Sequence, residues 1–218
     1  MGELTPTFIE LARQLTAAGR RFDRRGWVLG TSGNFSAVVS REPLLLAMTP
    51  SGAWKGELAP EDIVQVDDRC QILNGGRKPS AEAPLHVEIA RQRHAGSVLH
   101  THSVWATVLS DEHAAQGGLA VHGYEMLKGL EGITTHEHEE WIPILENLQD
   151  MGRLAVTVRE TLSGHPACHA FLLRRHGLYT WGSTLPDAIR HVEILEFLLE
   201  TIGRTAERSS HGGDQDSR

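Results

Sequence analysis

The apolar residues of this chain fall mainly into short runs of strand length, which turns containing glycine or proline separate from one another. Such runs, rich in aliphatic and aromatic residues, predict short strands. They occupy residues 35–39, 44–48, 63–66, 71–73, 97–101, 169–173 and 178–181. The centre of the chain, residues 121–147, is richer in polar residues, and we expect it to be irregular.

Longer segments with apolar residues at helical spacing lie between these runs. They predict helices over about residues 6–25, 80–93, 103–110, 149–162 and 184–202. In the last of them, Thr184 and Asp187 have the spacing of a capping box. Because helices that alternate with strands cover both faces of a sheet, the pattern predicts an α/β fold in three layers. One domain is expected over residues 1–203, and the polar residues 204–218 are expected to form a disordered tail.

Composition restricts the partners that this chain of 218 residues can have. Its net charge is −7 with histidine neutral, so we expect no binding to nucleic acid. An anionic small molecule must be held by a local site that works against this charge. No apolar run approaches the roughly 20 residues that cross a bilayer, and the N-terminus has no signal-peptide pattern. We therefore expect a cytoplasmic protein whose two cysteines, Cys70 and Cys168, are reduced.

Thirteen histidines are present, and the spacing of a few of them is typical of a metal site. His100 and His102 lie two residues apart on a predicted strand, so both imidazoles face the same side. His176, just after another strand, is our candidate for a third ligand, since catalytic zinc keeps three protein ligands and one open position. A lone pair of this kind also occurs among ordinary core or surface histidines. His136 and His138 form a second such pair in a polar stretch, and we expect no metal there.

Three turns bear hydroxyl groups and could bind a phosphate. They are residues 30–34, 49–52 and 78–80, and a helix is expected to start at Ser80. Backbone amides that a turn leaves free, together with serine and threonine hydroxyls and a helix N-terminus, form anion sites without many lysines. Each turn is equally typical of an ordinary structural turn, so only their combination points to a phosphate.

Five motifs in a fixed order carry a resemblance to a known family. They are GTSGN at 30–34, TPSG at 49–52, KPSAE at 78–82, VLHTHS at 98–103 and RRHGL at 174–178. In this order they resemble the class II aldolase and adducin family, over roughly Leu11 to Ile202. The resemblance implies a central, mostly antiparallel sheet flanked by helices, and a homotetramer with its sites at subunit interfaces.

The same resemblance implies which residues form the site. One zinc ion per subunit is expected on His100, His102 and His176. The implied phosphate-binding residues are Thr31, Asn34, Ser51, Gly52 and Ser80. The aldolases of the family carry a second serine where this chain has Ala81, so one hydroxyl contact is missing here.

The central segment distinguishes branches of the family. Residues 122–129 and 143–147, and also 174–182, resemble the dehydratases of methionine salvage rather than the sugar-phosphate aldolases. This implies zinc-dependent loss of water from 5-methylthioribulose 1-phosphate, giving 2,3-diketo-5-methylthiopentyl 1-phosphate. The dehydratases place their catalytic acid/base at the position of Glu125, and the aldolases place theirs at the position of Glu82.

Two other functions remain open on the sequence. A fuculose-1-phosphate-like aldolase would use Glu82, which this chain retains. A non-catalytic, adducin-like interaction domain would keep only the fold, and the complete set of three histidines argues against it. Both glutamates also have an ordinary interpretation, because carboxylates near a helix start are stabilised by the helix dipole.

Overall fold

One nine-stranded sheet organises the chain, of which the computed structural model describes residues 8–74 and 76–212. Its strand order is β4-β3-β2-β1-β5-β9-β8-β7-β6. Neighbouring strands are antiparallel except β7 and β8, which are parallel. The strands are β1 (Asn34–Arg41), β2 (Leu44–Met48), β3 (Val64–Asp67), β4 (Ile72–Asn74), β5 (Ser97–Thr101), β6 (Gly118–His122), β7 (Glu139–Leu145), β8 (Ala170–Leu173) and β9 (Gly177–Gly182).

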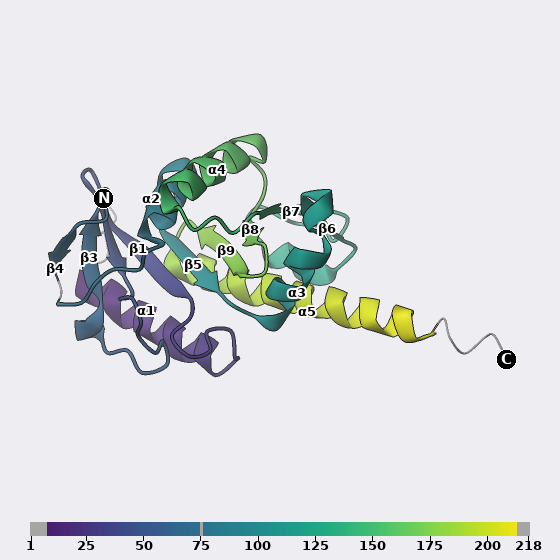
Figure 1. Ribbon diagram of the computed structural model, residues 1–218, viewed down its shortest axis with the longest axis horizontal. Coiled ribbons are helices and arrows are strands. Elements are labelled where there is room, and N and C mark those ends of the chain that lie inside the picture. Colours follow the sequence, from purple (N-terminus) through teal and green to yellow (C-terminus); the bar gives the residue numbers. More distant parts are fainter. Residues whose placement is uncertain (1–7, 75, 213–218) are drawn as a thin grey trace.

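Helices cover both faces of this sheet, which confirms the predicted three-layer α/β fold. The α-helices are α1 (Phe8–Asp23), α2 (Ala83–Gln92), α3 (Val104–Glu112), α4 (Met151–Gly164) and α5 (Leu185–Gly212). Short 3₁₀ turns are η1 (Pro60–Asp62), η2 (Ala114–Gln116) and η3 (Glu125–Gly129). Figure 1 shows α2 and α4 on one side of the sheet and α1 and α5 on the other. No helix among the described residues is both long and apolar enough to cross a membrane.

The alternation of side chains along the central strands decides which residues reach the site. On β1, Phe35 packs in the core below α1 and α5, so its neighbour Asn34 faces the α2 side. On β5, Leu99 belongs to the same core, so His100 also faces α2. Asn34 lies directly opposite His100, and His100 lies opposite Tyr179 of β9. Three polar side chains from distant parts of the sequence therefore form one row on the face below α2.

Two sequence predictions differ from the structure in the middle of the chain. Residues 121–147 are not irregular throughout, because β6 and β7 pair with each other and β7 joins β8. The polar residues of this segment gave no strand pattern, because these strands are stabilised by their pairing in the sheet. Helix α2 starts at Ala83 rather than at Ser80, and Ser80 instead accepts a hydrogen bond from the Glu82 amide at 3.2 Å. Pro84 in the first turn suits this later start.

The last helix ends later than the sequence predicts. Its start agrees with the predicted cap, since the Thr184 hydroxyl accepts a hydrogen bond from the Asp187 amide at 3.3 Å. We expected Gly203 to end the helix and a disordered tail to follow, but α5 continues to Gly212. A methyl group at Gly203 would lie 2.0 Å from the Trp105 ring, so this glycine allows close packing of α5 on α3. Residues 213–218 lie outside the described part of the chain.

Candidate functional site

Three imidazoles meet at the end of β5 and the turn between β8 and β9. The Nε2 atoms of His100 and His102 are 2.8 Å apart, and His176 Nε2 lies 3.3 Å from the first and 3.1 Å from the second. Nitrogens bound at about 2.0–2.1 Å to a tetrahedral zinc ion are about 3.3 Å apart. The three side chains therefore fit a single metal ion.

The protonation of these imidazoles also suits a metal. His100 is completely buried, and its Nδ1 donates to the Leu178 carbonyl at 2.9 Å, which leaves Nε2 free to be a ligand. Burial lowers the pKa of His100 well below its usual value and, with the neighbouring His176 and Lys55, lowers the pKa of His102 to about 4. Neutral imidazole is the form that coordinates a metal.

Two glycines allow the strands that carry these ligands to approach closely. A methyl group at Gly177 would lie 2.0 Å from the Thr101 carbonyl oxygen, so β9 can meet β5 there only with glycine. Gly33 has φ +71° and would place a methyl group 2.7 Å from the His100 carbonyl oxygen. The glycine in each of the two motifs is therefore part of the packing that brings the site together.

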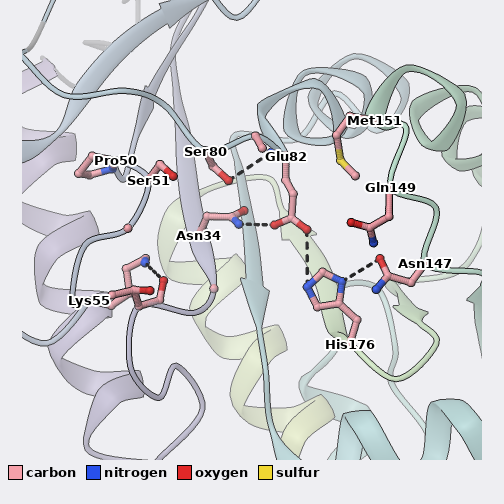
Figure 2. Close-up of a pocket in the computed structure, with 14 residues that line it drawn as sticks. Asn34, Pro50, Ser51, Lys55, Ser80, Glu82, Asn147, Gln149, Met151 and His176 are labelled. Atoms are coloured by element: carbon pink, nitrogen blue, oxygen red, sulfur yellow. Dashed lines mark hydrogen bonds and ion pairs between the residues drawn. The ribbon is translucent and has the colours of Figure 1, made fainter.

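A cavity of about 420 Å³ is lined by His176, one of the three histidines (Figure 2). This volume is in the usual range for a site that binds a small molecule. The predicted phosphate-binding residues all line it, namely Thr31, Asn34, Ser51, Gly52 and Ser80. Glu82 and His176 line it as well, so the hydroxyl-bearing turns and one histidine of the cluster share this cavity.

Glu82 lies between the turns and the histidines. Its Oε2 is 3.6 Å from His100 Nε2, and its Oε1 is 3.6 Å from His176 Nε2. The Asn34 side-chain amide donates to Oε2 at 2.5 Å, as drawn in Figure 2. A carboxylate at this distance from two of the three imidazoles can act as a base or adjust the metal's surroundings.

A buried histidine fixes the orientation of Asn34. His86 Nε2 donates a short hydrogen bond to the Asn34 side-chain oxygen, while its Nδ1 lies 2.8 Å from the Ser36 hydroxyl. Because the oxygen of Asn34 is occupied in this way, its NH₂ group must face Glu82. The sequence offered His86 only as one of many histidines, and no spacing rule identified it.

His86 also makes the stability of the fold depend on pH. Complete burial lowers the pKa of His86 to about 3, while an unfolded chain titrates near 6.5. The unfolded state binds one more proton between these values, so stability falls as the pH drops below 6.5. Between pH 7 and pH 5, we expect the free energy of unfolding of wild type to fall by about 2 kcal/mol more than that of His86→Gln.

Urea unfolding of both proteins at the two pH values measures this difference. The matched control is His122→Gln, because the side chain of His122 is exposed on β6 and the substitution should leave the wild-type difference unchanged. An identical pH dependence in wild type and His86→Gln would show that His86 contributes nothing.

Three further residues of the site were missed in the sequence. Asn147 accepts a hydrogen bond from His176 Nδ1 at 3.2 Å and so orients that imidazole. Tyr179 stacks on His100 with ring centres 3.9 Å apart, and burial and the Glu82 charge raise the pKa of its phenol. Lys55 lines the cavity and is buried. Asn147 and Tyr179 had a signal, since both lie in segments that carry the family resemblance, whereas Lys55 had none.

Glu125 does not join this cavity within its own chain. Its side chain is 73% exposed on η3, where Lys128 Nζ lies 2.7 Å away and His136 Nδ1 lies 3.8 Å away. His138 contacts Glu140 at 2.9 Å instead of a histidine partner. Among the described residues, the group that could hold a metal is the one formed by the three histidines at the cavity.

Comparison with known proteins identifies the family that the five sequence motifs resemble. The model of the class II aldolase and adducin N-terminal domain matches residues 13–202. Methylthioribulose-1-phosphate dehydratase of Pseudomonas savastanoi pv. phaseolicola is 45% identical over 192 residues, which cover 88% of this chain and 93% of that protein. The enzyme of the same name from Methylococcus capsulatus is 46% identical over 190 residues, with 87% and 91% covered.

A solved structure shows the same fold. L-fuculose-1-phosphate aldolase from Thermus thermophilus superposes with a TM-score of 0.72 at 24% identity, over 94% of this chain and 99% of that one. The sheet order, the three converging histidines and these matches all point to the same family. The chain therefore belongs to the class II aldolase and adducin family, in the branch of its dehydratase relatives.

Proposed function

We propose that this protein is a zinc-dependent hydro-lyase of methionine salvage. Its substrate is 5-methylthioribulose 1-phosphate, and its product is 2,3-diketo-5-methylthiopentyl 1-phosphate. The observation that supports this most is that a cavity lined by three hydroxyl-bearing turns is also lined by His176, one of three converging imidazoles. The names of relatives that match most of the chain support the choice of substrate.

The phosphate group binds at the turns in this proposal. Ser51, Gly52 and Ser80 lie on one side of the cavity, and Thr31 and Asn34 lie on the adjoining β1 turn. The Ser51 amide is already bonded to the Lys78 carbonyl at 2.9 Å, so its hydroxyl is the group available to the phosphate. The sugar carbons then extend from the turns toward Glu82 and the histidines.

The reaction moves one proton and one hydroxyl group. A zinc ion on His100, His102 and His176 supplies Lewis-acid stabilisation of the charge that develops at the carbon 2 oxygen. A carboxylate takes the proton from carbon 3. The hydroxyl leaves carbon 4 as water with a proton returned by an acid, and the remaining enol loses the proton of its carbon 3 hydroxyl and gains one at carbon 4 to give the diketone. General acid/base catalysis of this kind contributes about 10²–10⁴-fold in rate.

We assign the acid/base role to Glu125 and place it in the site of a neighbouring subunit. Its exposed side chain and its absence from the cavity of its own chain support an intersubunit role. The hydrogen bond from Lys128 lowers the pKa of Glu125, so its side chain is an ionised carboxylate at neutral pH. A homotetramer with sites between subunits, working in the cytoplasm with both cysteines reduced, completes this proposal.

One observation favours a second function. Glu82 lies within the cavity and beside two of the three imidazoles, which is where an aldolase of this family would need its base. Product analysis distinguishes the two functions. We expect the diketone from 5-methylthioribulose 1-phosphate and no cleavage of fuculose 1-phosphate, while carbon–carbon cleavage of either sugar would support the aldolase.

The phosphate group should be required for efficient turnover. Hydrogen bonds to a charged group are worth about 1.5–3 kcal/mol each, so loss of two or more lowers kcat/KM by at least about 10²-fold. The measurement compares 5-methylthioribulose with its 1-phosphate at equal enzyme concentration. Equal efficiency on both sugars would show that the turns do not bind a phosphate.

A further inference from the structure

A buried lysine lies at the base of the hydroxyl-bearing turns. Lys55 is only 1% exposed, and its Nζ donates to the Thr31 carbonyl and to the Ala53 carbonyl, both at 2.8 Å. Thr31 belongs to the turn before β1, and Ala53 directly follows the turn after β2. Figure 2 shows the side chain of Lys55 reaching up from below the cavity. One ammonium group therefore ties two of the three turns together.

The main chain at Lys55 is held firmly as well. A methyl group at Gly19 of α1 would lie 2.3 Å from the Lys55 carbonyl oxygen, so helix and loop are in close contact. The two hydrogen bonds of Nζ hold the ammonium group in place, and they use two of its three N–H bonds. The third has no acceptor among the residues that the structure describes.

The charge of the cavity shows what this third donor is suited to bind. Of the residues that line the cavity, Lys55 is the only lysine or arginine, and Glu82 supplies a negative charge nearby. The whole chain carries −7, so a dianionic phosphate at the turns would otherwise meet net repulsion. Burial lowers the pKa of Lys55 to about 8, while the Glu82 charge opposes that change, so most of the population is cationic at pH 7.

We propose that Lys55 is the cation of the phosphate subsite, which holds the Thr31 and Ala53 turns at the correct spacing and gives its third N–H to a phosphate oxygen. This inference rests on the phosphate subsite of the proposed function and adds to it a residue that recognises charge. The amides and hydroxyls of the turns form the anion site, and an ammonium group adds to it a charge-assisted hydrogen bond, which is roughly twice as strong as one between neutral groups.

The test measures binding of inorganic phosphate to the zinc-loaded protein by calorimetry. Lys55→Met keeps the length of the side chain and removes the charge. We expect it to weaken phosphate binding about 10- to 100-fold, as loss of a charge-assisted hydrogen bond does. The matched control is Arg24→Met, because Arg24 is an exposed cation that belongs to none of the three turns and does not line the cavity. It should change binding less than about twofold, the remote charge being screened.

Wild-type affinity in Lys55→Met, or equal losses in both variants, would overturn the inference. If Lys55→Met does not fold, a crystal structure of the wild-type zinc protein with inorganic phosphate decides. We expect a phosphate oxygen about 2.7–3.2 Å from Lys55 Nζ. A phosphate bound only at the histidines, one held by the turns without contact to Nζ, or no bound phosphate would each count against the role of Lys55. Neither experiment uses turnover, so its result is independent of whether the reaction is dehydration or aldol cleavage.

Discussion

Replacing a histidine of the cluster removes the metal and the activity together. In His176→Ala two imidazoles remain, and we expect zinc affinity to fall at least about 10²-fold, since each ligand carries a large share of the binding free energy of such a site. His176 is the best choice because its side chain is 18% exposed, whereas the fully buried His100 would leave a cavity when truncated. Metal analysis and turnover of the purified variant measure both effects.

The second histidine pair supplies the control for this experiment. Neither His136 nor His138 lies near the cluster, and His138 is bound to the buried Glu140. The double variant of His136 and His138 to alanine should therefore keep one zinc ion per chain. A result in which this double variant loses its metal while His176→Ala keeps it would refute the assignment of the ligands.

Glu125→Gln should lower turnover by at least about 10²-fold and leave the zinc content unchanged, as removal of a general acid/base does. The substitution keeps the size of the side chain, which is exposed, so the fold should not be affected. Glu82→Gln should cost less, mainly because Asn34 would lose a charged hydrogen-bond partner and the histidines a nearby negative charge. Steady-state kinetics and zinc content of both variants give the comparison.

The intersubunit position of Glu125 has its own control. A mixture of inactive Glu125→Gln and inactive His176→Ala subunits should regain activity, because one subunit would supply the glutamate and the other the metal site. Mixed subunits without activity would refute the proposed position of Glu125. An inactive Glu82→Gln beside a nearly unaffected Glu125→Gln would reverse the two roles and favour aldol cleavage.

The sequence predicted the features that depend on local spacing. His100 and His102 share one side because side chains alternate along a strand, and the structure brings their Nε2 atoms to 2.8 Å from each other. The amphipathic helices were found for the same reason. Errors arose where tertiary contacts override local signals. Helix α5 continues past Gly203, where it packs closely against the Trp105 ring. Residues 121–147 contain strand residues that are stabilised by the pairing of β6 with β7.

By itself the sequence determined the three-layer class of fold, the three histidines and the turns, because each depends on residues close together in the chain or on motifs of a known family. Only the tertiary structure placed Asn34 beside His100 across two strands, His86 behind Asn34, and Glu82 within 3.6 Å of two imidazoles. It also put Lys55 beneath two turns and left Glu125 exposed. These relations join residues that are far apart in the chain, and the register of the sheet and the packing of α1 and α2 fix them, which no local pattern specifies.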